Sequence, residues 1–201
     1  MKASGPSVRS GSLTSPVSKG NRRLKLDLHT HCGEATSLYT PTPDIVKQIV
    51  AAARSKGLDG IAITEHNNRA YGYKVKQIAE QQLHEDILII PGQEIDRGPL
   101  HIVVLYLPDE TTFRFVGHPG YPPVKDLAAE IDDSIHGLEI SNPTHDDEID
   151  AALVTSIAKE RGLLLLKNSD AHFLSDIGKY YTEIELDELC ARARQTRHSQ
   201  P

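Results

Sequence analysis

The side chains best suited to chemistry gather in short polar stretches, each placed directly after an apolar run. The first stretch, LDLHTHCGE at 26–34, holds two histidines that are two residues apart. The stretch NSDAH at 168–172 repeats that spacing with an aspartate and a histidine. Other apolar runs are followed or bordered by single histidines or carboxylates. The candidates are His29, His31, His66, Glu94, His101, His118, Asp170 and His172.

Imidazoles and carboxylates in such numbers form a typical ligand set for zinc, manganese or iron ions. Six histidines with at least two carboxylates exceed what one tetrahedral ion needs. The set therefore predicts two or three divalent metal ions, with Glu94 well suited to bridge two of them. Paired metals roughly 3.5–4 Å apart are a known device for hydrolysing phosphate esters.

The remaining polar residues of interest have weaker claims. Asp27 precedes the first histidine pair, and it either orients His29 or His31 or is a buried aspartate that caps a local turn. Cys32 and Cys190 lie too far apart in the sequence to indicate a zinc knuckle or a disulfide framework. The four other histidines are expected in helices, loops or the tail, without a ligand role: His84, His136, His145 and His198.

The elements that must position these residues alternate between short apolar runs and helical patterns. Strands are predicted at 24–28, 60–64, 87–90 (continuing towards 95), 100–107, 113–116, 138–141, 163–167 and 181–186. Helices are predicted at 43–56, 70–84, 125–134, 146–161 and 187–195. Only four residues, DRGP at 96–99, separate two of the strands, so these two should form an antiparallel hairpin.

This alternation predicts an α/β fold with a mostly parallel sheet, either a barrel or an open doubly wound sheet. The candidate residues then lie at the C-terminal edge of the strands, where functional sites of such folds form. Strand alternation predicts that His29 and His31 share the face of Asp27, while the leucines at 24, 26 and 28 face the surrounding helices.

The composition is that of a globular protein, with 38% hydrophobic and 25% charged residues over 201 positions. The Ser-, Gly- and Pro-rich stretch 1–21 is predicted to be a disordered tail, 22–195 one domain, and 196–201 a C-terminal tail. The net charge of −6 and the scattered basic residues disfavour binding of long nucleic acid. No segment is typical of a signal peptide or membrane span, so the expected location is the cytoplasm.

Five motifs, in this order, resemble those of PHP-domain phosphoesterases, the polymerase and histidinol phosphatase superfamily. They are DLHTH (27–31), ITEH (63–66), PGQE (91–94), GHP (117–119) and NSDAH (168–172). The resemblance covers roughly residues 24 to 185. It implies a distorted (β/α)7 barrel with a trinuclear metal site at its C-terminal face.

The resemblance also assigns ligands residue by residue. His29 and His31 match the opening pair, which Asp170 joins, and Glu94 matches the bridging carboxylate. The second metal would be completed by His101 and His118, and the third would be held by His66 and His172, with Glu34 as the acidic ligand that many members place after the opening pair. Two departures stand out. Glu65 replaces the usual aspartate, and the short segment before the first predicted helix leaves the identity of the third metal's extra ligand open.

The leading hypothesis is hydrolysis of a small phosphate monoester by a metal-bridging hydroxide. Asp27 and His172 are the candidate catalytic residues beside the metal ions, and Arg69 and Lys179 are candidates for binding the phosphate. The alternatives are a phosphodiesterase or 3′–5′ exonuclease acting on nucleotides or short nucleic-acid ends, a metal-dependent amidohydrolase, and a metal-binding regulatory module without activity. The oligomeric state and the substrate stay open.

Overall fold

The structure of this chain is a computed structural model that describes residues 22–195. The predicted tails at 1–21 and 196–201 lie outside the described residues. No helix within 22–195 has both the length and the apolar character needed to cross a lipid bilayer.

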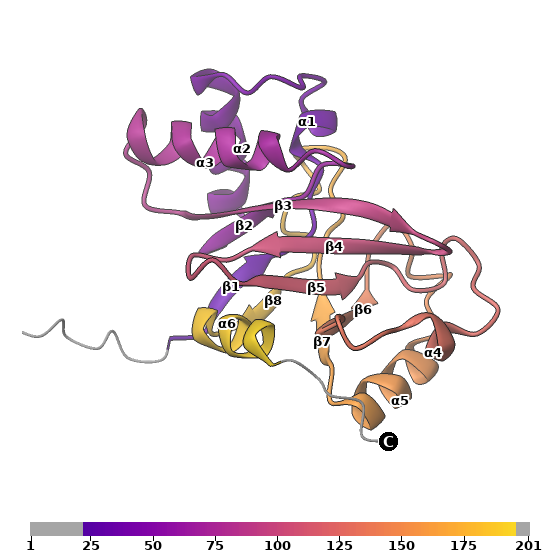
Figure 1. Cartoon of the computed structure of the whole chain (residues 1–201). Helices are drawn as coiled ribbons and strands as arrows, with labels where there is room; N and C mark the ends of the chain where they lie inside the picture. The colour runs from indigo at the N-terminus through magenta and orange to yellow at the C-terminus, as the bar shows by residue number, and fades with distance from the viewer. Residues whose placement is uncertain (1–21, 196–201) are drawn as a thin grey trace, which may run out of the picture.

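The described residues form one mixed sheet of eight strands that curls into a nearly closed barrel (Figure 1). The strand order is β7-β6-β5-β4-β3-β2-β1-β8. The expected hairpin of β3 and β4 is antiparallel, as are the pairs β4–β5 and β1–β8, and the other neighbours are parallel. The strands are β1 (Leu24–Asp27), β2 (Gly60–Ile63), β3 (Leu88–Arg97), β4 (Leu100–Tyr106), β5 (Thr112–Val116), β6 (Gly137–Ser141), β7 (Leu164–Lys167) and β8 (Thr182–Ile184).

The two edge strands meet through one side chain. The Thr182 hydroxyl on β8 accepts a hydrogen bond from the Lys167 amide at 2.9 Å and donates one to the Lys167 carbonyl at 3.0 Å. This contact takes the place of backbone hydrogen bonds between β7 and β8.

The α/β barrel expected from the resemblance is confirmed. It has eight strands, including the two strands of the β3–β4 hairpin.

Six helices cover the sheet (Figure 1). They are α1 (Cys32–Ala35), α2 (Pro43–Ser55), α3 (Arg69–Gln81), α4 (Leu127–Glu130), α5 (Ala151–Arg161) and α6 (Leu186–Arg194). As expected, α2 begins behind Thr42, whose hydroxyl accepts a hydrogen bond from the Ile45 amide. In Figure 1, α1, α2 and α3 lie together beyond β2 and β3, and α4 and α5 lie at the opposite end.

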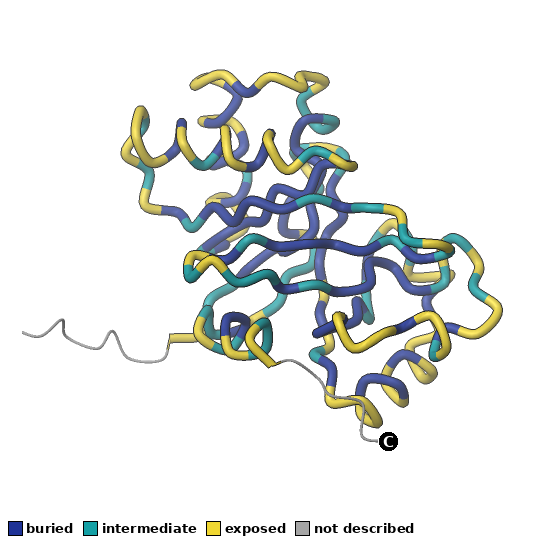
Figure 2. Tube along the Cα trace, in the orientation of Figure 1, coloured by how far each residue is buried: buried dark blue, intermediate teal, exposed yellow. Residues whose placement is uncertain are grey.

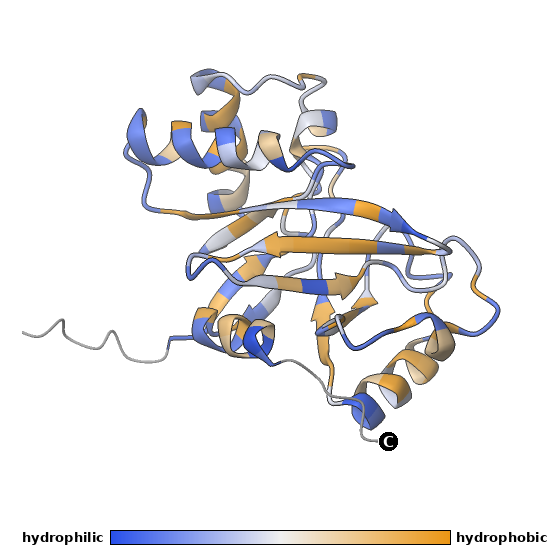
Figure 3. Cartoon of the chain, viewed as in Figure 1, coloured by the Kyte–Doolittle hydropathy of each residue, from blue (hydrophilic) through white to orange (hydrophobic). Residues whose placement is uncertain are grey.

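The core has an inner and an outer part. The inner cluster takes side chains from strands at both ends of the sheet order, such as Leu26, Leu105 and Leu166, so it fills the barrel. Helix α6 adds Leu189 to this cluster. Two outer clusters pack α2 and α3, and α4 and α5, against the sheet. Strand β2 is buried throughout and β4 over most of its length (Figure 2), and β4 is hydrophobic over most of its length (Figure 3).

The first strand differs from the sequence-based expectation. Leu26 and Leu28 pack inside the barrel, rather than against the surrounding helices. Strand β1 ends at Asp27, and the side chain that follows, Leu28, still lies on the same side as Leu26. The His29 ring lies edge-on to the ring of Phe115 on β5.

Two predicted helices are shorter than expected. The helix predicted at 125–134 spans only Leu127–Glu130, because Ile131 is extended and the Asp132 carboxylate accepts hydrogen bonds from the amide and hydroxyl of Ser134 in a turn. The helix predicted at 146–161 begins at Ala151, capped by Asp150. Residue Asp146 instead fixes a loop, with its carboxylate on the hydroxyl of Ser141 and the amide of Asn142.

Candidate metal centre

The centre of the site is Glu94 on β3, a carboxylate with a side chain that is only 2% exposed. Its backbone amide donates to the carbonyl of Thr64, which fixes β3 beside the end of β2. Five imidazoles surround its two oxygens. The Oε1 atom lies 3.1 Å from His118 Nε2, 3.2 Å from His101 Nδ1 and 3.6 Å from His29 Nε2, and Oε2 lies 3.1 Å from His66 Nδ1 and 3.4 Å from His31 Nε2.

The opening histidine pair converges with Asp170. The Nε2 atoms of His29 and His31 lie 3.2 Å apart, and Asp170 Oδ1 is 3.5 Å from the first and 3.1 Å from the second. Backbone hydrogen bonds hold the two segments in this position, from the Asp170 amide to the His29 carbonyl and from the His31 amide to the Ala171 carbonyl. Both imidazoles are fully buried.

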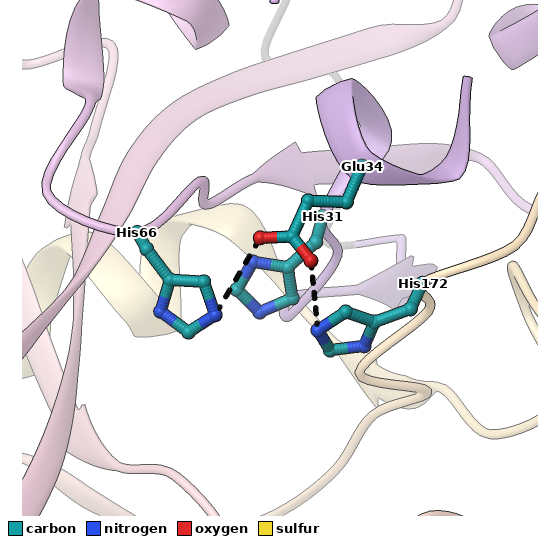
Figure 4. A group of neighbouring side chains, drawn as sticks. All are labelled: His31, Glu34, His66 and His172. Carbon is teal, nitrogen blue, oxygen red and sulfur yellow. Dashed lines mark ion pairs between the residues drawn. The ribbon is translucent and has the colours of Figure 1, made fainter. Parts of the chain in front are cut away.

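A third group lies at the mouth of the site (Figure 4). The Glu34 carboxylate lies between two imidazoles, 3.8 Å from His66 Nε2 and 3.6 Å from His172 Nε2. The His31 ring stacks on both of these histidines. The three side chains Glu34, His66 and His172 are 33–44% exposed, so solvent reaches this part of the site.

Glu65, the departure from the usual aspartate, supports this group from behind. Its buried carboxylate accepts a hydrogen bond of 2.6 Å from the Gly33 amide in α1. A side chain at Gly33 would meet the Glu65 carboxylate at 2.9 Å. The contact therefore fixes α1, and with it Glu34, at the mouth.

The second ring nitrogens of several histidines are held by other groups. His118 Nδ1 lies 2.9 Å from the carbonyl of Tyr121, and His172 Nδ1 lies 2.9 Å from the carbonyl of Asp170. His29 Nδ1 faces Glu139 Oε1 at 3.4 Å. In each case Nε2 remains available to the site. Ligating histidines in metalloproteins are usually oriented in this way.

Glu139 was not anticipated from the sequence. It lies on β6, is fully buried, and also accepts hydrogen bonds from the His118 amide, Asn142 and Asn168. Its position after Leu138 does not distinguish it from other carboxylates on strands. The sequence indicates only that an acidic residue in a short apolar strand is buried and needs a hydrogen-bond partner.

The Asp27 carboxylate forms its hydrogen bonds with residues other than the histidines. Its carboxylate accepts hydrogen bonds from the amide and hydroxyl of Ser169 and from the amide of Gly178. Burial raises its pKa to about 6. Of the two readings open from the sequence, the structure favours the buried aspartate that fixes local backbone, here the loop that carries Asp170, and Glu139 faces His29 instead.

The arrangement fits divalent cations. The nitrogens of His29 and His31 and the oxygens of Glu94 and Asp170 lie 3.1–3.6 Å from one another in the pairs given above. Ligands about 2.0–2.1 Å from one tetrahedral ion would be separated by about 3.3 Å. Asp170 Oδ1 is buried without a hydrogen bond, which is costly unless a cation satisfies it.

The electrostatics of the site also favour positive charge. Burial alone would lower the pKa of His31, but its close contacts with the carboxylates of Asp170 and Glu94 outweigh burial and raise that pKa to about 9. The pKa of His29 is raised as well, against burial, by Asp170, Glu94 and Glu139. Burial opposes ionisation of Glu94 and Asp170, yet the neighbouring histidines hold both carboxyl pKa values far below their usual range. Two ionised, buried carboxylates therefore require nearby cations.

Two of these residues have an unusual backbone conformation. His118 has φ of 27° and Asp170 has φ of 49°, both in the left-handed region that non-glycine residues rarely adopt. Such a conformation persists where the surrounding structure enforces it, often at functional sites.

The candidate phosphate-binding residues are engaged outside this cluster. The Arg69 guanidinium lies over the Tyr106 ring, 5.8 Å from its centroid, and Lys179 forms an ion pair of 2.8 Å with Asp176. Among residues 22–195, neither forms a hydrogen bond or ion pair with a predicted ligand. The structure therefore does not bring these two predicted side chains into the site.

Three histidines without a predicted role lie within the described residues. His84 is exposed, and His136 is buried where its Nδ1 accepts a hydrogen bond from the Arg114 amide. His145 differs from both, because its ring lies 4.5 Å from that of His118 at the site. Its place after β6 follows the same pattern as the predicted ligands. His198 lies outside the described residues.

The C-terminal part of the chain matches a known protein family. Residues 149–196 match the model of a family described as PHP-associated. The uncharacterized protein MJ1587 of Methanocaldococcus jannaschii is 29% identical over 150 residues, which are 63% of this chain and 86% of that protein.

Two solved structures share the fold. PsfC from Pseudomonas syringae superposes with a TM-score of 0.61 at 16% identity, over 83% of this chain and 87% of PsfC. A protein from Bifidobacterium adolescentis, named as a candidate metal-dependent phosphoesterase, has the same TM-score and identity, over 83% of this chain and 96% of its own.

Proposed function

We propose that the chain is a member of the PHP-domain family and a metal-dependent phosphoesterase that hydrolyses a small phosphate monoester, a proposal supported by the match of residues 149–196 and by the shared fold. The observation that carries the proposal is the convergence of five imidazoles on the buried Glu94 carboxylate. The name of the B. adolescentis structure supports the same reaction class.

Three groups of ligands support the binding of two or three ions. His29, His31 and Asp170 would hold the first, His101 and His118 the second, and Glu34, His66 and His172 the third. Glu94 would bridge, because its two oxygens face different histidines. Divalent ions bound there supply a nucleophilic hydroxide at neutral pH and stabilise charge on the phosphoryl oxygens.

The residues of the chain determine which ions bind, how His29 is oriented and where the substrate enters. Buried Glu94 and Asp170 hold the negative charge that selects cations, and Glu139 fixes the orientation of His29. The exposed edge formed by Glu34, His66 and His172 admits the ester. Arg69 contacts Tyr106 and Lys179 pairs with Asp176, so the bound metal ions would be the main groups that receive the phosphate.

The test compares p-nitrophenyl phosphate with bis-p-nitrophenyl phosphate, using protein loaded with manganese or zinc. The proposal predicts faster hydrolysis of the monoester, and loss of activity in His29→Ala. A matched control is His84→Asn, which changes an exposed histidine away from the site and should retain activity. Preference for the diester would indicate a phosphodiesterase, and equal rates for the wild type and His29→Ala would contradict the proposed site.

A further inference from the structure

Tyr121 places a half-exposed aromatic ring beside one group of candidate ligands. The centroid of its ring lies 6.1 Å from that of His118 and 6.5 Å from that of His101, edge-on in both cases. Both of these histidines face the Oε1 atom of Glu94. Tyr121 is 47% exposed, so a large part of the residue is in contact with solvent at the edge of the metal centre.

Backbone and ring contacts fix the position of the Tyr121 ring. Its amide donates to the His118 carbonyl at 3.0 Å, and its carbonyl accepts a hydrogen bond from His118 Nδ1 at 2.9 Å. The ring stacks on that of His145 with a centroid distance of 4.4 Å and an angle of 20° between the ring planes. His145 thus covers one face of the Tyr121 ring, and the other face is left for a flat group to stack on.

This ring is placed to contact the part of the ester that is released. In the proposed reaction the phosphoryl group binds among the metal ions around Glu94, and the alcohol part extends from it. Aromatic pairs form at roughly 4.5–7 Å between ring centroids. An aromatic ring attached to the ester oxygen would therefore come within stacking distance of Tyr121.

The charges near Tyr121 favour a ring without a second negative charge. Its stacking partner His145 has a carboxylate as neighbour, because a Glu148 oxygen lies 3.9 Å from His145 Nδ1. The two cations expected at the site, Arg69 and Lys179, contact residues outside it. A leaving group that carries a further phosphate or carboxylate would therefore meet repulsion here.

We propose that Tyr121 is a specificity-determining residue, which stacks on a neutral aromatic ring in the leaving group of the phosphate monoester. The inference rests on the proposed function, because it names the kind of alcohol that the same centre releases. Rates of hydrolysis alone do not test it, since aryl oxygens are better leaving groups than alkyl oxygens whatever residue lies beside them. The test must therefore measure binding.

Phosphonates are suitable probes, because their carbon–phosphorus bond is not hydrolysed. Isothermal titration calorimetry on manganese-loaded protein measures the affinities of phenyl-, cyclohexyl- and methylphosphonate. The wild type should bind phenylphosphonate roughly three- to tenfold more tightly than the other two, as expected for one aromatic pair. 4-Carboxyphenylphosphonate should bind more weakly than phenylphosphonate, and the opposite order would contradict the preference for a neutral ring.

The variants separate the ring from the hydroxyl group. Tyr121→Leu should lose most of the preference for phenylphosphonate and bind methylphosphonate as the wild type does, whereas Tyr121→Phe should keep the preference. Tyr73→Leu is the matched control, because Tyr73 is 48% exposed and its ring contacts Tyr106. An unchanged preference in Tyr121→Leu would overturn the proposal.

The wild-type comparison decides the question even if Tyr121→Leu fails to fold. Equal wild-type affinities for phenyl-, cyclohexyl- and methylphosphonate would overturn the proposed role of Tyr121 and leave the proposed function intact. The expected preference without hydrolysis of p-nitrophenyl phosphate would contradict the proposed function alone. If no phosphonate bound, both proposals would be contradicted.

Discussion

The Nε2 atoms of His29 and His31 lie 3.2 Å apart and face the same carboxylate oxygen of Asp170. Two imidazoles placed in this way compete for one acceptor unless a cation lies between them. At both histidines burial lowers the pKa, and the neighbouring carboxylates raise it.

Metal affinity should rise with pH. In the metal-free protein the contacts with Asp170 and Glu94 raise the pKa of His31 to about 9, so the ring is protonated at pH 7. A metal ion must displace that proton, because only the neutral imidazole is a ligand. Affinity should therefore increase about tenfold per pH unit for each proton displaced, up to pH 9. Chelator competition between pH 6.5 and 9 measures this, and a flat profile would contradict it.

Glu139→Gln should weaken metal binding without unfolding the protein. The substitution keeps the size of a buried side chain 3.4 Å from His29 Nδ1 but removes the negative charge that orients the ring. Loss of such a supporting contact typically lowers metal affinity about 10- to 100-fold. Isothermal titration calorimetry measures the affinity, and circular dichroism checks the fold. The control is Glu183→Gln, at an exposed position of β8. Equal affinity in both variants would show that Glu139 does not orient the ligand.

Glu34→Gln should remove one metal equivalent and leave the others in place. Glu34 pairs with His66 and His172 at the exposed mouth, whereas the remaining carboxylates of the site are buried. Without its charge, two neutral imidazoles are the main ligands left for the third ion. Equilibrium dialysis followed by elemental analysis counts the equivalents, with Glu160→Gln on the exposed face of α5 as control. An unchanged count in Glu34→Gln would exclude this residue as a required ligand.

Gly120→Ala should destabilise the loop that carries His118. Gly120 has φ of 126°, and a Cβ atom would lie 2.2 Å from the Glu148 carbonyl oxygen. The backbone conformation alone costs roughly 1–3 kcal/mol for other residues, and the clash adds to it. Gly98→Ala is the matched control, because Gly98 also has a positive φ but open space around it. Thermal unfolding should show a larger fall in Tm for Gly120→Ala, and equal falls would refute the role of the clash.

The positions of most candidate ligands could be predicted because they depend on local pattern. Apolar runs locate the strands, and polar residues just after parallel strands meet at one edge of a sheet. His66 and Asp170 are found on this basis. The hairpin prediction for His101 also succeeded, because four residues between two strands leave no room for a crossover.

Other features depend on contacts that the local sequence does not contain. Two readings of Asp27 stayed open in the sequence, because its hydrogen-bond partners Ser169 and Gly178 lie far along the chain. Glu139 faces His29 only because β6 and β1 curl towards each other in the barrel. The helix predicted from 146 starts at 151 because the Asp146 side chain stabilises a loop. That same loop carries His145 to the site.

The most direct test of the account is elemental analysis of protein purified without chelator and reconstituted with manganese or zinc. Two ligand groups beside Glu94, His29 with His31 and Asp170 and His101 with His118, predict at least two metal ions per chain. Fewer than two ions per chain after reconstitution would contradict the multinuclear centre.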